Sequence, residues 1–274
     1  MAASATAHAG EVNQAPVAHH FDNLLQQQAT VRFGMWLFLI TEVLFFAGVI
    51  CAYTVYRIWY PREFEAGSAA LNVGIASVNT FLLLASSLTI TLGIRACYEG
   101  SAGRLRLWIL ATMVLGTAFL GLKMREYYLD YEEGLIPSQA KFVEWVPDGN
   151  GQFVPVHRSV FGEAVKKALE KEHVKTDNVN FDRVQLFFMF YYVMTGLHVL
   201  HMVVGLGLLL WQYILASTGF FNYPQRYIYI EVMSLYWHFV DIVWIFLVPL
   251  LYLAGHHTFE QAVEGFKQAL GMTH

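Results

Sequence analysis

The chain has 274 residues, of which 56% are hydrophobic, 16% are aromatic and only 14% are charged. Soluble domains carry about 25% charged residues, so this composition argues against a soluble enzyme and against a disordered chain. A formal net charge of -4 argues against a nucleic-acid binder, which needs a basic face. Two cysteines, Cys51 and Cys97, are too few for a four-cysteine metal site.

Five long segments are almost free of charged residues. A helix needs about 20 apolar residues to cross ~30 Å of hydrocarbon, and only helices and closed barrels satisfy their backbone there. The segments are too long for barrel strands. The sequence therefore predicts an all-α, polytopic membrane protein, with transmembrane helices at residues 31–59, 70–98, 103–132, 183–216 and 226–254.

The remaining residues divide into tails and one long loop. We expect a flexible polar tail at 1–30 without a signal peptide, a transmembrane domain at 31–254 and a C-terminal tail at 255–274. Five crossings place the two termini on opposite sides. Arginines flanking the second inter-helix loop favour a cytoplasmic N-terminus and an outer C-terminus.

The loop at 133–182 is the one soluble excursion. Two β-prone runs, 142–146 and 152–156, flank a Pro-Asp-Gly-Asn-Gly turn, which predicts a hairpin. Alternating charge with Ala and Leu over Val160–His173 predicts a short amphipathic helix after it.

Ionisable side chains within these helices are costly and are therefore the candidate functional residues. Glu42 lies in the middle of the first helix. It is interpreted equally well as a proton or lipid-headgroup contact and as a neutral carboxyl bonded to a neighbouring helix. Glu126 follows Lys123 and Arg125, and we favour a structural ion cluster at the interface with snorkelling cations.

His198 and His201 are three residues apart on the fourth helix. They suggest metal or haem ligation. However, haem takes axial ligands from opposite sides and copper needs more ligands than one helix offers here. We therefore favour hydrogen bonding between helices.

The last helix carries four polar residues within an arc of about 80°. These are Glu231, Ser234, His238 and Asp241. Such a ridge must face protein or water rather than acyl chains, and a polar packing seam is the favoured interpretation.

The second helix has small or polar residues every seventh position, which is typical of close helix packing in membranes. They are Asn72, Asn79, Ser86 and Gly93. The chain has no phosphate-binding loop, no HExxH and no cysteine pair at metal spacing, so we predict no catalytic residue and no metal site.

Four motifs occur in order at residues 33–48, 125–128 with 134–137, 195–205 and 236–244, and together they resemble the cytochrome c oxidase subunit III family. Residues 33–48 resemble its third helix, and 125–128 with 134–137 resemble its Glu-Tyr helix end. Residues 195–205 resemble its Thr-Gly-x-His-x-x-His motif, and 236–244 match its last helix.

This resemblance implies a non-redox subunit of a haem-copper terminal oxidase in the bacterial plasma membrane. The haem and copper would belong to partner subunits I and II, which carry electrons from cytochrome c to oxygen. Subunit III itself would bind no cofactor except phospholipids in a cleft, and would sustain proton uptake by the complex.

Two features depart from the family pattern. The two leading helices of the seven-helix form are missing, and the 133–182 loop is unusually long. That loop either contacts a cytochrome c or a neighbouring respiratory complex, or is an insertion without function.

Other functions remain open on sequence alone. The chain is alternatively a third subunit of a quinol oxidase or an accessory subunit of nitric oxide reductase. Outside the family, the alternatives are a membrane haem or metal protein using His198, His201 and His238, or a proton transporter.

Overall fold

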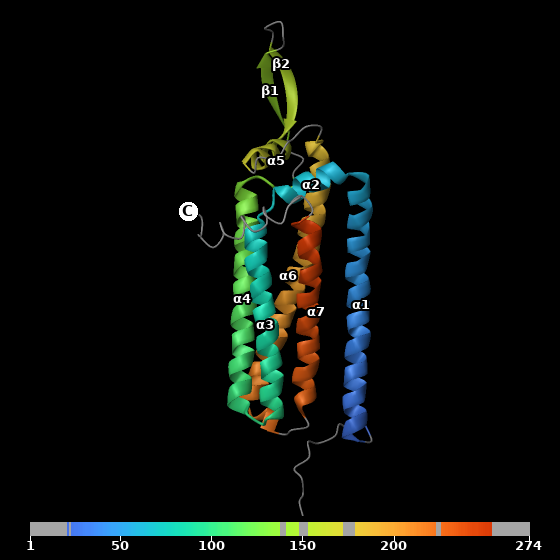
Figure 1. Cartoon of the computed structure of the whole chain (residues 1–274), viewed down its shortest axis with the longest axis vertical. Coiled ribbons are helices and arrows are strands. Elements are labelled where there is room, and N and C mark those ends of the chain that lie inside the picture. The colour runs from blue at the N-terminus through green and yellow to red at the C-terminus, as the bar shows by residue number, and fades with distance from the viewer. Residues whose placement is uncertain are drawn as a thin grey trace, which may run out of the picture.

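The computed structural model describes residues 21, 23–137, 141–147, 153–171, 179–222 and 226–253. Five long helices stand side by side in a bundle, and a small extramembrane cap covers one end (Figure 1). All five are long and apolar enough to cross a membrane, which confirms the predicted polytopic architecture. They are α1 (Leu24–Trp59), α3 (Val73–Tyr98), α4 (Ala102–Glu132), α6 (Phe181–Ser217) and α7 (Tyr227–Leu251).

Helix α1 begins earlier than the sequence predicted. The Asn23 side chain caps it by accepting a hydrogen bond of 2.8 Å from the Gln26 backbone N–H, a common way to start a helix. Residues 24–30, assigned above to a flexible tail, therefore belong to a helix. The bounds of the other four helices differ from the prediction by three residues or fewer. The predicted C-terminal tail at 255–274 lies outside the described residues.

A short helix, α2 (Pro61–Ala69), was not predicted. It starts with a proline at a position where the missing N–H costs nothing, and turns across the end of the bundle (Figure 1). Phe64 is fully buried, and a Cβ on Gly67 would clash with the Phe187 ring of α6. The close approach of α2 to α6 thus depends on glycine at this position.

The long loop is ordered where the structure describes it. Strands β1 (Lys141–Pro147) and β2 (Phe153–Ser159) pair antiparallel, with Lys141 opposite Ser159. They form the predicted hairpin, which extends away from the bundle (Figure 1). Its turn lies outside the described residues.

Helix α5 (Val160–Lys171) follows the hairpin, as the sequence predicted. It rests on the bundle through its apolar face. Phe161, Val165 and Leu169 are fully buried, and the Phe161 ring meets that of Phe188 at 5.4 Å. The loop therefore has two parts. Helix α5 packs on the bundle and forms the base, and the hairpin of β1 and β2, which we call the arm, projects from it.

Helix α7 lies at the centre and packs against α1, α3 and α6. Its Trp237 is fully buried and donates from Nε1 to Ser86 Oγ of α3 at 3.0 Å. Gly116 of α4 and Gly205 of α6 make room for the indole, since a Cβ on either would approach it to about 3 Å. One tryptophan thus joins three neighbouring helices.

The predicted packing face of α3 holds at three of its four positions. Asn79 and Ser86 are fully buried, and a Cβ on Gly93 would touch Trp108 of α4 at 3.4 Å. Asn72 does not belong to this face. It is exposed and caps α3 by accepting from the Ile75 backbone N–H at 3.1 Å, because the helix starts only after it.

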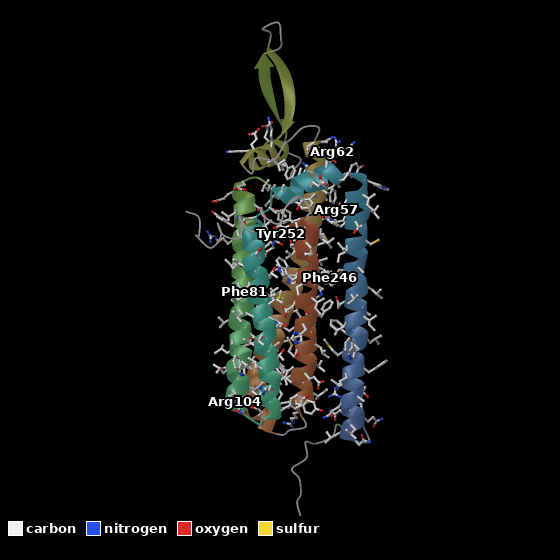
Figure 2. All side chains as sticks on the ribbon, viewed as in Figure 1. Arg57, Arg62, Phe81, Arg104, Phe246 and Tyr252 are labelled. Carbon is white, nitrogen blue, oxygen red and sulfur yellow. The ribbon has the colours of Figure 1, made fainter. Side chains whose placement is uncertain are left out.

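The turn between α3 and α4 carries an exposed ion cluster. Glu99 binds Arg95 at 2.9 Å and Arg104 at 2.7 Å. The hydrogen bond from Arg95, with the charge of Arg104, holds the pKa of Glu99 below its usual value. The cluster is thus intact at neutral pH and is lost as the pH falls through that lowered pKa. Arg104 lies at the opposite end of the bundle from Arg57 and Arg62 (Figure 2).

Candidate functional site

The first polar centre joins α1 to α6. Glu42 Oε2 lies 3.1 Å from His201 Nε2, and His201 Nδ1 lies 2.8 Å from the Leu197 carbonyl oxygen. A carbonyl only accepts, so Nδ1 carries a hydrogen. The contact between Nε2 and Oε2 then holds one proton, which belongs either to the imidazole or to the carboxyl.

This shared proton makes the pair neutral in either form. A carboxylic acid faces a neutral imidazole, or a carboxylate faces an imidazolium. Both forms avoid an isolated charge within the membrane-spanning region, which would be costly. Glu42 therefore bonds to a neighbouring helix, as one of the two interpretations above expected, and His201 makes the expected inter-helix hydrogen bond.

His201, one member of this pair, borders a cavity of about 360 Å³ between α1, α6 and α7. The cavity is lined by Val31, Met35, Phe38, Leu200, His201, Val204, Leu208, Gln212, Tyr229, Val232, Met233 and Tyr236. We call it the α1 groove. Its walls are largely apolar, with a few polar groups. Gln212 is 9% exposed, and its Oε1 has no hydrogen-bond partner among the described residues.

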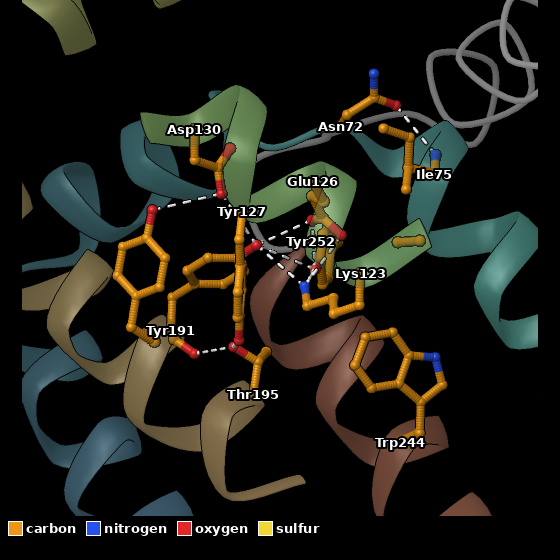
Figure 3. A network of polar contacts seen from close by, with 12 residues as sticks. Asn72, Ile75, Lys123, Glu126, Tyr127, Asp130, Tyr191, Thr195, Trp244 and Tyr252 are labelled. Atoms are coloured by element: carbon orange, nitrogen blue, oxygen red, sulfur yellow. Dashed lines mark hydrogen bonds and ion pairs between the residues drawn. The ribbon is translucent and has the colours of Figure 1, made fainter. Parts of the chain in front are cut away.

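The second polar centre surrounds Lys123 of α4 (Figure 3). Its Nζ donates to Glu126 at 3.0 Å and to the Tyr191 hydroxyl at 3.1 Å, and also contacts the Tyr252 hydroxyl. Lys123 is fully buried and Glu126 is 2% exposed. The predicted charge compensation between the two is confirmed. The predicted snorkelling of Lys123 is wrong, because its ammonium group points into the bundle toward α6 and the end of α7.

Asp130 is a member of this network that the sequence analysis missed. It is 7% exposed and accepts from Tyr191 at 3.3 Å and from Tyr192 at 3.4 Å. It stands four residues after Glu126, on the same face of α4. That spacing would have identified it as a partner in the cluster.

Aromatic rings complete the enclosure of the ammonium group. Those of Tyr127, Tyr191, Trp244 and Tyr252 have centroids 4.7–5.4 Å from Nζ. Cation–π attraction of this kind is strongest where water is excluded. The Lys123 network thus ties α4, α6 and the end of α7 together.

His198 lies in the core, away from His201. It is fully buried between Phe119 at 5.6 Å and Trp244 at 5.0 Å, measured between ring centroids. Neither ring nitrogen has a hydrogen-bond partner among the described residues. The hydrogen bond to another helix that was expected of His198 is therefore absent there. Packing between aromatic rings has taken its place.

The polar ridge of α7 serves two different neighbours. Near the start of α7, Glu231 binds Arg32 of α1 at 2.9 Å. Further along, His238 Nδ1 lies 2.7 Å from Ser87 Oγ of α3. Ser234 and Asp241 are both 3% exposed. The favoured interpretation of a packing seam fits this arrangement, although the seam has two partners.

The three histidines therefore do not converge. His198 faces the core, His201 faces Glu42 and His238 faces α3. In the part of the chain that the structure describes, no three His, Cys, Asp or Glu side chains gather as metal ligands. This geometry argues against a metal or haem held by the three histidines together.

The sequence of this chain matches a known membrane family. The model of the family described as "Cytochrome c oxidase subunit III" matches residues 14–131 and 177–256. The chain belongs to this family. Subunit III is accordingly a multi-pass component of a haem-copper oxidase complex, as the sequence predicted.

Curated relatives agree with this assignment. Subunit 3 of the cytochrome bo(3) ubiquinol oxidase of Pseudomonas aeruginosa is 25% identical over 87% of this chain and 92% of its own. Cytochrome c oxidase subunit 3 of a Synechocystis species is 30% identical over 81% of this chain and 74% of its own. Cytochrome c oxidase subunit 3 of Thermostichus vulcanus is 27% identical over 80% of this chain and 85% of its own.

The family match leaves out residues 132–176. This segment contains the hairpin and α5. The site residues Glu42, Glu126, His198, His201, Glu231, His238 and Asp241 all lie within the matched part. The two polar centres therefore lie in the part of the chain that matches the family, whereas the hairpin and α5 lie outside that match.

Proposed function

We propose that subunit III carries no redox group and stands beside oxidase subunits I and II, which hold the haem and copper. In that position it retains phospholipid and sustains proton uptake by the complex. The observation that carries the proposal is the Glu42–His201 pair beside the α1 groove. The pair is a neutral, proton-sharing unit at the edge of an apolar cavity that this chain leaves open, and it has the character of a lipid contact rather than of a redox centre.

The α1 groove suits a phospholipid acyl chain. Its apolar walls run between α1, α6 and α7, and Arg32 follows the lining residue Val31 at the end where α1 begins. The Arg32 side chain is 40% exposed, although it also binds Glu231. A phospholipid fits both the groove and Arg32 when its acyl chain lies along the groove and its anionic headgroup lies at the Arg32 side chain.

We further propose the orientation predicted from the sequence, with the N-terminus in the cytoplasm. It is supported by Arg32, Arg95, Arg104, Arg106 and Arg226, which flank the end of the bundle where α1 begins. The hairpin and α5 then stand on the outer side. There the arm is positioned to contact a cytochrome c or a neighbouring complex, as the sequence analysis suggested for this loop.

For the electron donor we propose cytochrome c. The Synechocystis and Thermostichus relatives are named cytochrome c oxidase subunits, whereas the Pseudomonas relative is named a ubiquinol oxidase subunit. A third subunit of a quinol oxidase is therefore the second candidate.

The test is to purify the native complex through an affinity tag on this chain. We expect co-purifying subunits, haem and copper in the complex, and faster oxygen consumption with reduced cytochrome c than with ubiquinol. After dissociation, the isolated chain should show no haem absorption. A haem band that stays with this chain would contradict the proposal. If the complex oxidises ubiquinol but not cytochrome c, the electron donor is a quinol instead.

A further inference from the structure

A polar cluster lies between α3 and α7 on the lateral surface of the bundle. His238 is half-buried there, with Nδ1 bonded to Ser87 Oγ at 2.7 Å and Nε2 only 3.5 Å from Thr91 Oγ1. Thr91 is exposed. Asp241, one turn further along α7, is 3% exposed.

The hydrogens of this cluster leave the imidazole incompletely satisfied. The Thr91 hydroxyl donates to the Ser87 carbonyl at 2.9 Å, so its oxygen only accepts from the histidine. The distance of 3.5 Å between His238 Nε2 and Thr91 Oγ1 is at the outer limit for a hydrogen bond. His238 Nε2 therefore retains the capacity to bond to a group outside this chain.

The depth of the cluster decides what that group can be. His238 stands about 16–20 Å from either end of α7, taking 1.5 Å per residue, and so lies near the middle of a spanning helix. Headgroups and bulk water are about 15 Å from the middle of the hydrocarbon layer. An imidazole left against acyl chains at this depth would be costly.

The α1 groove does not cover this surface. Residues two apart on a helix point about 200° from one another, so His238 lies on the opposite side of α7 from Tyr236, which lines the groove. Around the cluster the surface is apolar. Leu84 is 50% exposed, Leu88 61% and Ile242 52%. A polar centre within an apolar surround is the composition of a protein interface rather than of a lipid-facing surface.

We propose that the α3–α7 face formed by Leu84, Ser87, Leu88, Thr91, His238 and Ile242 is the surface on which a membrane-spanning helix of another oxidase subunit packs. That helix presents a hydrogen-bonding side chain to His238 near the middle of the membrane. This inference rests on the proposed function, which supplies the premise that other oxidase subunits are present.

Two exposed threonines provide a matched test. Thr91 on this face and Thr117 on α4 are both exposed, and each donates to the carbonyl four residues before it. A photo-crosslinking amino acid at position 91 should form a covalent adduct with another subunit of the complex in native membranes. The same amino acid at position 117 should yield mainly lipid adducts.

A second measurement removes the polar contact itself. His238→Leu should reduce the co-purification of partner subunits about tenfold, the effect of losing one inter-helix hydrogen bond. The amount of the chain in the membrane should stay unchanged, which separates docking from folding. If His238→Leu also lowers that amount, the crosslinking experiment decides alone.

The proposal is overturned if position 91 crosslinks only to lipid in a complex that retains its haem and its other subunits. If no haem-bearing subunit accompanies the chain at all, the proposed function fails instead. The two failures are thus distinguished by the composition of the purified complex.

Discussion

At the scale of single residues, two pairs of ionisable groups in the membrane domain neutralise one another. Glu42 shares a proton with His201, and Lys123 is neutralised by Glu126. The two pairs differ in whether a molecule outside the bundle can reach them. His201 borders the α1 groove, whereas Lys123 is fully enclosed. We therefore expect substitutions at the first pair to affect what enters the groove, and those at the second to affect folding.

Glu42→Gln keeps a hydrogen bond but removes the shared proton. The amide N–H of the glutamine donates to His201 Nε2, because Nδ1 already donates to the Leu197 carbonyl, so the variant should assemble with its full haem content. We expect less co-purified phospholipid, or activity that declines sooner during prolonged turnover, measured by phosphate analysis and by oxygen uptake over time. Glu42→Ala, which loses the hydrogen bond as well, should show the larger effect. Loss of haem from the Gln variant would contradict the assignment.

Lys123→Met should destabilise the protein strongly. It leaves Glu126 buried without a cation, and breaking a buried ion pair from one side costs about 3–5 kcal/mol. Thermal unfolding in detergent measures the loss. The double variant Lys123→Met with Glu126→Gln should recover much of it, since no unpaired charge remains. Arg104→Met is the exposed control and should change little, because Glu99 keeps Arg95 and stays in water. Equal losses in the single and double variants would argue against the ion pair as the cause.

At the scale of elements, glycines set how closely the helices approach. Trp237 of α7 fits between α4 and α6 only because Gly116 and Gly205 lack side chains. The indole then reaches Ser86 of α3. Helix α2 approaches Phe187 in the same way through Gly67. By contrast, α1 is sparsely packed, and only 11% of its most apolar stretch is buried within this chain.

Gly116→Val should therefore lower the unfolding temperature. Its side chain would meet Trp237, which cannot retreat because Gly205 holds its other side, and overpacking typically costs about 1–3 kcal/mol. Gly121→Val is the matched control on the same helix, since a Cβ there meets nothing within 4 Å. Thermal unfolding of the purified protein compares the two. Similar unfolding temperatures would show that the Trp237 contact is not tight.

At the scale of the whole molecule, the chain consists of a bundle that matches the family and a hairpin with α5 that lies outside the match. The match to the family stops before residue 132 and resumes at 177, and the hairpin and α5 lie between. Helix α5 is held by buried Phe161, Val165 and Leu169, whereas the described strands pair with one another and meet the rest of the chain mainly at α5. The arm is therefore separable from the bundle, while its base is not.

Replacing residues 141–159 by a short Gly–Ser linker should leave the bundle intact. Lys141 and Ser159 are opposite one another in the hairpin, so a short linker spans the gap. We expect unchanged haem content and unfolding temperature, and slower turnover with cytochrome c if the arm contacts the donor. Phe161→Ala, at the fully buried base, should instead cost about 3–5 kcal/mol. If removing the arm alone unfolds the protein, the two parts are not separable.

The sequence by itself determined the five spans, the hairpin with its following helix, and the family. These follow from local properties, namely runs of apolar residues, turn residues and motifs in order. It also identified Glu42, Glu126, His201 and His238 as candidates, because an ionisable residue within an apolar run stands out without knowledge of its partner. Helix α2 was missed because it is too short and polar to resemble a span, and the start of α1 was missed because its first turns are polar.

Only the tertiary structure decided which groups meet. His201 binds a glutamate 159 positions away, and Lys123 meets one tyrosine on α6 and another directly after the end of α7. Which way each side chain points depends on the rotation of a helix about its axis, and that rotation is set by packing contacts between distant segments. For this reason Lys123 turned inward where snorkelling was expected. The three histidines considered as ligands of one metal or haem face three different neighbours.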